Sequence, residues 1–300
     1  MDPTRTIHRV LQNFVIIIIM TTCMPAPTSA KKLQDYPLAK IKVSYACHDE
    51  HLKTDAKAYT AEYQMILLAN SAESKFYNQQ CEYRDSLDTT PSGKAIYREI
   101  ITNMASKYAE TGVLDDSALP QCKMYIFKSR NDSTLSFYDK NGSSHSHFYI
   151  EPLCEMRWQI GDSTKTILGY ECIAAETDFH GRHWNVWFTP EIPIQDGPWK
   201  FCGLPGLILE AADATGQHSF IADGIEESNI CMIPVYAEKD YEKVSRIEML
   251  AAQRRFLLKG DSMSRMFIQN TPDGSKIDMT HTEYNDNPDL HIDFLETDYH

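Results

Sequence analysis

The sequence has few of the features from which an enzymatic activity is usually inferred. It contains no Gly-x-Ser-x-Gly, no His-Glu-x-x-His and no Gly-x-x-x-x-Gly-Lys-Ser/Thr pattern, the motifs of common hydrolases, zinc peptidases and P-loop NTPases. No two cysteines stand in Cys-x-x-Cys spacing, so a thioredoxin-like or zinc-ribbon site has no support. We therefore predict no catalytic residue and no cofactor, and keep a hydrolase with an unfamiliar arrangement as an alternative.

Positive charge is also scarce. The chain has 29 Lys and Arg residues against 42 Asp and Glu residues, a formal net charge of −13. This balance disfavours nucleic acid and anionic lipid as partners, because both are themselves negatively charged. It tolerates a cationic or neutral ligand and selects none.

Long hydrophobic runs are absent. The longest strongly apolar run, Phe14 to Met20, has seven residues and is too short to cross a bilayer as a helix. Basic residues precede it, and the small residues that end at Ala30 suit a signal peptidase. We predict a signal peptide over residues 1–30, cleavage after Ala30 and no transmembrane anchor.

A second way of processing the leader stays open. Cys23 follows Met-Thr-Thr, which loosely matches a lipoprotein cleavage box, so a protein anchored by a lipid at Cys23 is the alternative. In either case the sequence predicts export, to the periplasm or the periphery of the outer membrane. Removal of residues 1–30 takes away Arg5, Arg9 and Asp2 and makes the formal charge about −14.

Cysteines are few and irregularly spaced. Cleavage after Ala30 would leave an odd number of them, so at least one is free or intermolecular, and two or three disulfides are possible. The sequence does not give their connectivity. The residues are Cys47, Cys81, Cys122, Cys154, Cys172, Cys202 and Cys231.

Residues 31–300 contain no internal repeat and no long Pro, Gly or Ser tract, so we predict a single domain, with an acidic tail from about residue 273. Apolar and polar residues alternate at 41–45, 59–68, 124–127 and 135–138, as in half-buried strands. The expected fold class is α+β: a mainly antiparallel, curved sheet of meander or half-barrel form with two packed helices.

Two segments show helical periodicity. After Pro91, apolar residues recur every four positions at Ile96, Ile100 and Met104, which predicts a helix whose apolar stripe lies against the sheet. A second helix is expected over about 236–259, with Gly260 as its stop. Its predicted apolar face consists of Val244, Ile247, Ala251 and Leu258.

Three hairpins are predicted between these helices. The first turns at His180-Gly181, with Gly suited to the positive φ of a primed turn, and pairs Phe179 with Arg182, Thr177 with Trp184 and Ile173 with Phe188. The second joins 207–212 to 217–222, and the third turns at 161–164. Residues 123–226 would then form one meander. Buried residues expected in the second hairpin are Leu207, Leu209 and Ile221.

Residues 197–209 read Gly-Pro-Trp-Lys-Phe-Cys-Gly-Leu-Pro-Gly-Leu-Ile-Leu, and we call them the signature tract. Pro205 fixes φ for the second position of a tight turn, and Gly206 readily takes the positive φ of the third. The pattern predicts a type II turn at residues 204–207 that leads into a buried strand.

This tract resembles the signature of the GLPGLI family, and matching blocks precede it at 162–172, 179–182 and 187–193, with an amino-terminal block at 74–77 and 85–86. The resemblance is dense over residues 155–225, and Cys202 departs from the pattern. It implies an exported cell-envelope protein, often encoded near TonB-dependent outer-membrane receptors, with no assigned reaction. The sheet also resembles the curved half-barrel of lipoprotein carriers, which hold an apolar guest.

A ligand or partner site is predicted around the signature tract. Aromatic side chains could line a groove for an apolar or peptide-like ligand, and basic ones could receive a carboxylate or phosphate. The alternative is that the aromatics are core residues and the basic groups are solvated or paired, for example with Glu210. The candidate residues are Arg182, Trp187, Trp199, Lys200, Leu204, Pro205 and Gly206.

A metal site is a second hypothesis. His145 and His147 share one face of a possible strand, and His180 and His183 flank a hairpin turn, so the four imidazoles could converge on an ion. The alternative is that they are exposed residues near turns.

From these observations we predict a non-enzymatic envelope protein that binds a small apolar or peptide-like ligand or an outer-membrane receptor. A metal-binding envelope protein and an unrecognised hydrolase remain alternatives.

Overall fold

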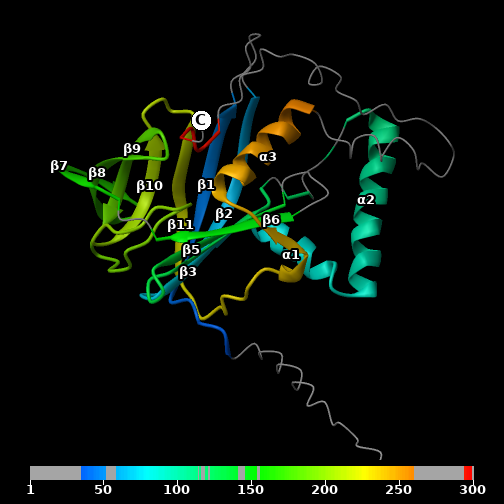
Figure 1. Cartoon of the computed structure of the whole chain (residues 1–300), viewed down its shortest axis with the longest axis horizontal. Helices are drawn as coiled ribbons and strands as arrows, with labels where there is room; N and C mark the ends of the chain where they lie inside the picture. The colour runs from blue at the N-terminus through cyan, green and yellow to red at the C-terminus, as the bar shows by residue number, and fades with distance from the viewer. Residues whose placement is uncertain are drawn as a thin grey trace, which may run out of the picture.

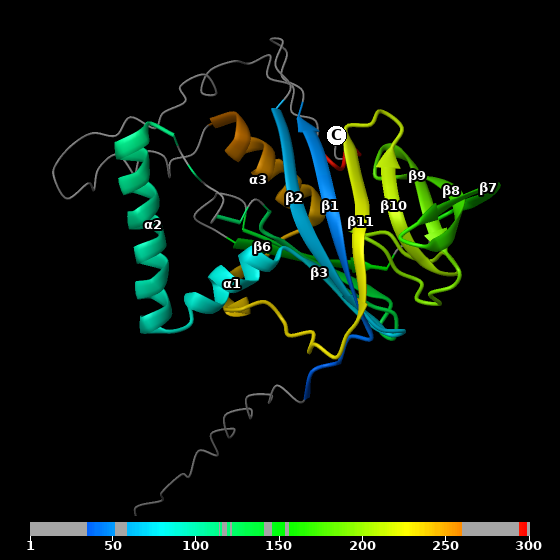
Figure 2. The ribbon, with the colours of Figure 1, turned by 180° about the vertical axis from the view of Figure 1, so that it is seen from behind.

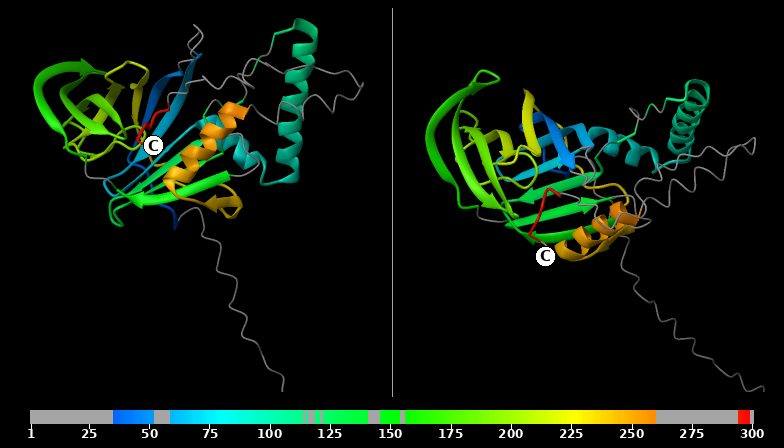
Figure 3. Two further views of the ribbon diagram at one scale, coloured as in Figure 1. Left: turned by 45° about the horizontal axis from the view of Figure 1, so that its top comes forward. Right: turned by 90° about the horizontal axis from the view of Figure 1, so that it is seen from above.

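The computed structural model describes residues 35–51, 59–113, 115, 119–120, 122–140, 146–153, 156–259 and 294–298. Within these ranges, twelve strands form one open sheet in the order β12-β6-β5-β4-β3-β2-β1-β11-β10-β9-β8-β7. Neighbouring strands are antiparallel, apart from the parallel pair of β12 and β6. Figure 3 shows the strong curvature of this sheet. The predicted curved, mostly antiparallel sheet is confirmed, and it does not close into a barrel.

The first strands are β1 (Ile41–His51), β2 (Tyr59–Ala69), β3 (Glu73–Tyr77), β4 (Met124–Ser129), β5 (Thr134–Asp139) and β6 (Ser146–Pro152). The others are β7 (Gln159–Ile167), β8 (Tyr170–Phe179), β9 (Arg182–Thr189), β10 (Leu207–Asp213), β11 (His218–Glu227) and β12 (Tyr241–Lys243). The helices are α1 (Gln79–Leu87), α2 (Pro91–Thr111), α3 (Arg246–Lys259) and the short 3-10 helix η2 (Glu238–Asp240).

The predicted single meander over residues 123–226 is two separate meanders. After β6 the chain passes to the opposite edge of the sheet, and β7 to β11 then return strand by strand until β11 pairs with β1 (Figures 1 and 2). The free edge of β1 receives β11, whereas the free edge of β6 receives the short β12. Strands β1 to β3 therefore lie between the two meanders, a long-range pairing that local turn signals cannot show.

Strands β2 to β4 are buried on both faces. Leu67 of β2 packs in the larger apolar cluster with Phe76 and Phe220, whereas its neighbours Ile66 and Leu68 pack in a second cluster on the other face. This follows from the alternation of side chains along a strand. The second cluster includes Cys81 of α1, the larger one contains the aromatic residues of the signature tract, and the sheet thus separates the two.

Helix α2 forms where its periodicity predicts, but it does not pack as expected. Thr90 caps its first turn by accepting a hydrogen bond from Gly93 N at 3.0 Å, and Gly112 ends it with φ 68°. A Cβ at Gly93 would lie 2.2 Å from Leu87 O, so α2 contacts α1 closely at its first turn. The rest of α2 stands away from the sheet (Figures 1 and 2), and Ile96 is exposed.

Helix α3 starts later than predicted, at Arg246, because Ser245 and Glu248 form a capping box. Glu248 N donates to Ser245 Oγ at 3.2 Å, and Ser245 N donates to Glu248 Oε2 at 2.8 Å. The segment before it forms η2 and β12 instead of helix. Of the predicted apolar face, Val244 is half-buried against the larger apolar cluster, but Ile247 and Ala251 are exposed, and Met249 and Leu250 are buried instead. The side chain of Leu258 and the predicted stop at Gly260 lie outside the described residues.

The first predicted hairpin is confirmed in its register and its turn. His180 and Gly181 both have positive φ, 51° and 81°, which identifies a type I′ turn. Its buried face carries Phe179, Trp184 and Phe188, and its outer face carries the partly buried Trp187. The observed pairs are Phe179 with Arg182, Thr177 with Trp184 and Ile173 with Phe188.

The other two hairpins need correction. In the second, Ala211 pairs with Phe220 and Ile221 points outward, 44% exposed, because alternation along β11 buries Phe220 and Ala222 instead. Leu207 and Leu209 are buried as predicted. The third turn lies at Leu168-Gly169 instead of residues 161–164, which form an irregular part of β7.

Disulfides are absent among the cysteines that the structure describes. Cys47, Cys81, Cys122, Cys172, Cys202 and Cys231 are all free thiols, so the two or three bridges considered from the sequence do not form among them. Burial raises the pKa of the Cys81 thiol to about 11, which keeps it protonated and unreactive. Cys154 lies outside the described residues.

No helix within the described ranges combines the length and the hydrophobicity needed to pass through a membrane. The predicted leader with Ala30 and Cys23 lies outside the described residues. Of the predicted acidic tail, the structure describes residues 294–298, and these lie against the sheet (Figure 1).

Candidate functional site

A buried ion pair fixes the start of the signature tract to the sheet. Lys128 of β4 lies with Nζ 2.6 Å from Oδ1 of Asp196, and neither side chain is exposed. The same ammonium donates to Gly197 O at 2.9 Å and Phe201 O at 3.0 Å. Arg130 contacts the other carboxylate oxygen of Asp196. One lysine thus holds both a carboxylate and two carbonyls, and it sets the path of the tract across the sheet.

The predicted type II turn at residues 204–207 is wrong, and Gly206 is required for a different reason. The positive φ values in this tract belong to Gly203 and Trp199, at 93° and 49°. Gly206 N donates to Leu204 O at 2.8 Å. Residues 204–206 therefore form a γ-type turn with Pro205 in its centre. A Cβ at Gly206 would lie 2.1 Å from Thr189 O, so close approach to β9 selects glycine here.

Several residues of the predicted groove lie in the core. Trp199 is 1% exposed, with its ring centroid 5.6 Å from that of Trp184 and 5.2 Å from that of Phe201. Leu204 is also buried, and Pro205 is exposed. These aromatic contacts pack the tract into the larger apolar cluster.

Trp187 is not brought together with the other candidates. It lies on the opposite face of β9 from Arg182 and Trp184, and Lys165 Nζ stands 4.4 Å from the centroid of its ring. Lys165 also pairs with Glu210 at 2.7 Å. Glu210 was considered from the sequence as a partner for the basic residues Lys200 and Arg182, whereas in the structure it pairs with Lys165.

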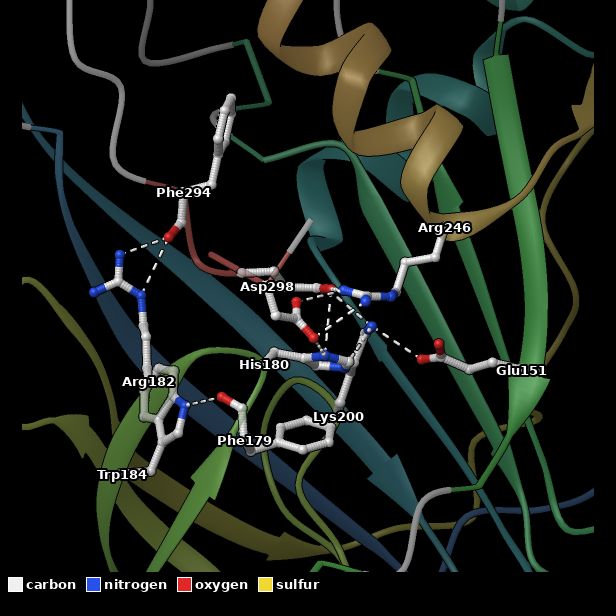
Figure 4. A network of polar contacts seen from close by, with 10 residues as sticks. Glu151, Phe179, His180, Arg182, Trp184, Lys200, Arg246, Phe294 and Asp298 are labelled. Carbon is white, nitrogen blue, oxygen red and sulfur yellow. Dashed lines mark hydrogen bonds and ion pairs between the residues drawn. The ribbon is translucent and has the colours of Figure 1, made fainter. Parts of the chain in front are cut away.

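Lys200 and Arg182 do come together, in a charged site beside the turn of β8 and β9. We name this the cationic site, formed by Arg182, Lys200 and Arg246 with His180 (Figure 4). We name residues 294–298, Phe-Leu-Glu-Thr-Asp, the docking segment. The contacts between them bring together the signature tract, the β8–β9 hairpin, the first turn of α3 and residues near the end of the sequence.

Lys200 holds two carboxylates although its side chain has no exposed surface. Its Nζ lies 2.9 Å from Glu151 Oε1 and 2.8 Å from Glu296 Oε1. It also donates to Nε2 of His180 at 3.3 Å. Because an ammonium only donates, Nε2 accepts and Nδ1 carries the proton that is donated to Asp298 Oδ2 at 3.1 Å. The imidazole therefore connects the lysine to the second carboxylate of the docking segment.

Arg246 receives both carboxylates of the docking segment. Its Nη1 lies 2.6 Å from Glu296 Oε2 and 2.8 Å from Asp298 Oδ1, and its Nη2 lies 3.1 Å from Asp298 Oδ2. The contacts to Asp298 are bidentate, the geometry that makes arginine specific for carboxylates.

Arg182 recognises the main chain of the same segment. It donates from Nε and Nη2 to Phe294 O at 3.2 and 2.6 Å, and its Nη1 lies 2.8 Å from Asp213 Oδ2. At the other end, Thr297 N donates to His180 O at 2.9 Å. Two backbone groups of the segment are thus fixed in addition to its two carboxylates.

The electrostatics of the site favour ionised carboxylates. Burial raises the pKa of Glu296, but the ammonium of Lys200, the imidazole of His180 when it is protonated at acidic pH, and hydrogen bonds from Lys200 and Arg246 together lower it. The pKa of Asp298 is lowered in the same way, against its burial, by Arg246 and His180. Burial is the largest cause of the lowered pKa of His180, so its imidazole is neutral at pH 7.

The predicted metal set is only partly assembled. Among the described residues, His180 has ligand atoms within 4.8 Å of those of Glu296 and Asp298. His183 instead pairs with Asp178 at 2.8 Å, His147 lies on β6 opposite Asp139, and His145 lies outside the described residues. Because Lys200 and Arg246 already hold the two carboxylates, a metal would have to displace these cations.

Sequence reasoning missed four residues of the site: Glu151, Arg246, Glu296 and Asp298. The last two belong to a segment read only as an acidic tail. A signal was present, since two carboxylates alternate behind an aromatic residue at Phe294, as in an extended segment with one anionic side. Nothing local in the sequence connects that segment to His180, more than a hundred positions earlier.

A search of curated proteins found no match. Among solved structures, the chain is similar to PNGF-II in two crystal forms, at 12% and 13% identity and TM-scores of 0.46 and 0.47. Each alignment covers 72% of this chain and 33% of the other, so the chain spans about a third of PNGF-II. A LolA superfamily protein from Nitrosomonas europaea matches at 9% identity and a TM-score of 0.24, over 68% of this chain and 92% of that one.

One family model matches the chain, across the region on which the site is built. The match begins at the turn residue His180, includes Arg182, Lys200 and Gly206, and ends at Glu210. This match lies inside the region of the GLPGLI resemblance and supports a related family of unknown function, but the family model does not name GLPGLI itself. Residues 180–210 match the model of Porph_ging, a family of proteins of unknown function.

Proposed function

We propose that this protein is a non-enzymatic binding protein of the cell envelope, exported by its predicted leader, which recognises an anionic group of a ligand or partner at the cationic site. One observation carries this proposal. Lys200, in the signature tract and without exposed side-chain surface, holds a carboxylate from the docking segment at 2.8 Å. Burying an ammonium is costly unless a carboxylate meets it, so the site is built for such a group.

The charge of the whole chain makes this site distinctive. The protein has a formal net charge of −13, yet three basic side chains are concentrated beside one turn. Arg246 has 18% of its side chain exposed, so part of the site can be reached from solvent. When the docking segment leaves the site, an acidic partner would be attracted here, although the net charge of the chain as a whole would repel it.

The finer proposal is that the partner is an outer-membrane receptor of the TonB-dependent class. It rests on the family resemblance of the signature tract, and the structure adds a requirement that the receptor present an acidic group. A small apolar ligand has less support, because Trp199 and Leu204 of the predicted groove are in the core.

This proposal predicts that partner capture depends on Arg246. Cross-linking in native envelopes, followed by affinity purification of the tagged full chain, should recover a defined partner with the wild-type protein and at least tenfold less with Arg246→Gln, because the variant lacks the bidentate carboxylate donor. Arg98→Gln is the matched control, since Arg98 is an exposed arginine of α2, and it should capture the same partner as wild type.

Equal recovery by Arg246→Gln and wild type, with both proteins folded by circular dichroism, would contradict the proposed function. A loss of partner that occurs equally in Arg98→Gln would contradict the assignment of the site.

A further inference from the structure

We propose that the docking segment is a resident ligand, and that the cationic site is a receptor for extended peptides that carry two carboxylates two residues apart. In this structure the chain's own Glu296 and Asp298 supply those carboxylates, and an equivalent segment of a partner protein can take their place. This inference rests on the proposed function, that the site binds an anionic partner, and it names the chemical class of that partner.

The site recognises peptide backbone as well as charge. Arg182 donates two hydrogen bonds to Phe294 O, and His180 O accepts one from Thr297 N. A free phosphate or a small carboxylic acid offers neither an amide donor nor a carbonyl acceptor at this spacing. Contacts to both backbone groups, three residues apart, therefore favour a peptide.

The spacing of the carboxylates matches an extended peptide. Side chains two residues apart point to the same side of an extended chain, and Glu296 and Asp298 both reach Arg246. Lys200 adds a second contact to Glu296 at 2.8 Å, and His180 adds one to Asp298 at 3.1 Å. Each carboxylate thus has two donors, one of them Arg246.

The turn of β8 and β9 leaves space for a peptide backbone. A Cβ at Gly181 would lie 2.2 Å from Thr297 Oγ1 and 3.0 Å from Asp298 N. At the equivalent position of the next turn along the sheet, Gly169 has φ 87° and nothing within 4 Å of such a Cβ. Both turns need a positive φ, but only the turn of the cationic site has a peptide packed on its glycine.

The basic residues keep other partners when the segment leaves. Lys200 still has Glu151 at 2.9 Å, and Arg182 still has Asp213 at 2.8 Å. Arg246 loses the carboxylates of Glu296 and Asp298, and it is partly exposed to solvent. Three cations then face two carboxylates, which leaves a net charge of about +1 to attract an acidic peptide.

The strand pairing of the sheet does not depend on the docking segment. None of the twelve strand positions is occupied by residues 294–298, and the segment contacts the hairpin turn, the signature tract and the start of α3. Its replacement by another peptide therefore leaves every strand pairing in place.

The test measures, by fluorescence anisotropy, how tightly the full chain binds the peptide Phe-Leu-Glu-Thr-Asp. The peptide is labelled with fluorescein at its amino end and amidated at its carboxyl end. In the Glu296→Gln/Asp298→Asn variant the resident segment is weakened, so the peptide should bind at least tenfold more tightly than to wild type. A peptide with Gln and Asn in place of Glu and Asp should bind at least tenfold more weakly than the acidic one.

Gly181→Ala and Gly169→Ala, each added to that variant, form a matched pair. Both strain a type I′ turn to a similar extent, but only Gly181→Ala fills the space of the peptide backbone. The first should weaken peptide binding at least tenfold, and the second should leave it within twofold. Should the charge variant fail to fold, Thr297→Pro takes its place, because it removes the donor to His180 O and keeps every charge.

Equal binding of the acidic and the amide peptides to a folded variant would overturn this inference, as would no binding of either. If the peptide fails while cross-linking to a partner still depends on Arg246, the partner is anionic but not of this peptide class, and the proposed function stands. If both fail, the proposed function fails as well.

Discussion

Asp196→Asn is expected to lower the free energy of unfolding by about 3 to 5 kcal/mol, the range found when one partner of a buried ion pair is removed. The change leaves Lys128 without its carboxylate at a position where its side chain has no exposed surface. It also weakens the contact to Arg130 and the hydrogen bond from Gly197 N to Asp196 Oδ1. Urea or thermal unfolding, followed by circular dichroism, measures the effect.

The same ion pair predicts how stability depends on pH. Burial raises the pKa of Asp196, but Lys128 and Arg130 outweigh it, and the pKa in the folded protein is lower than usual. A group with a lowered folded pKa contributes its full stability above its unfolded pKa, about 3.9 for Asp, and loses it as the pH falls through the folded pKa. Asp196→Asn should therefore reduce the acid-induced loss of stability.

Glu226→Gln is the matched control for this prediction. Glu226 pairs with Lys42 at 2.7 Å, a similar distance, but its side chain is 62% exposed. A surface pair contributes about 1 kcal/mol at most, so the control should change the stability little. If Asp196→Asn costs no more than Glu226→Gln, the buried pair does not anchor the signature tract.

Gly206→Ala is expected to destabilise the protein by about 3 kcal/mol, as severe overpacking does. The added methyl would lie 2.1 Å from Thr189 O and 2.9 Å from the Cα of Pro190. Both neighbours are backbone atoms, so relief requires the tract and β9 to move apart. For a chain of this size the melting temperature should fall by roughly 6 to 12 °C.

Two further variants separate crowding from backbone strain. Asn tolerates positive φ better than Ala, so a type II turn would tolerate Gly206→Asn, whereas the observed contact with Thr189 rejects any Cβ. We expect Gly206→Asn to be at least as destabilising as Gly206→Ala, and Pro205→Ala, at an exposed position, to cost about 1 kcal/mol at most. Recovery of wild-type stability by Gly206→Asn would contradict the steric account.

The parts of the fold that could be predicted are those decided by neighbouring residues. The register of β8 and β9 follows from the turn at His180-Gly181 together with the alternation of apolar residues, because a slip by one residue would expose the buried face. The extent of α2 likewise follows from local periodicity and its caps at Thr90 and Gly112.

The parts that could not be predicted depend on distant contacts. The pairing of β1 with β11 joins Ile41 to Glu227 across most of the sequence, and no turn marks it. Helix α2 stands away from the sheet, although its periodicity is equally compatible with packing against the sheet. As a result of the pairing of β1 with β11, strands β6 and β7 are far apart in the sheet, although a series of consecutive hairpins would make them neighbours.

Less than half of the residues of the candidate site could be identified from the sequence, for a physical reason. Lys200 was identified from its place in the signature tract and Arg182 from its place near that tract, but charged side chains are rarely fully buried, so Lys200 was not expected to lie in the interior with Glu151. The docking segment was unforeseen because its contacts with His180 and Arg246 join it to residues that are distant in the sequence.

The central claim is that residues 294–298 are held on the cationic site, and amide hydrogen exchange at Thr297 tests it most directly. Thr297 N donates to His180 O at 2.9 Å, so its exchange, measured by NMR on the full chain, should be slowed at least tenfold from the rate of an unstructured peptide. Protection should decrease in Arg246→Gln and persist in Arg98→Gln. Exchange of Thr297 at the unstructured rate in the wild-type protein would contradict the account.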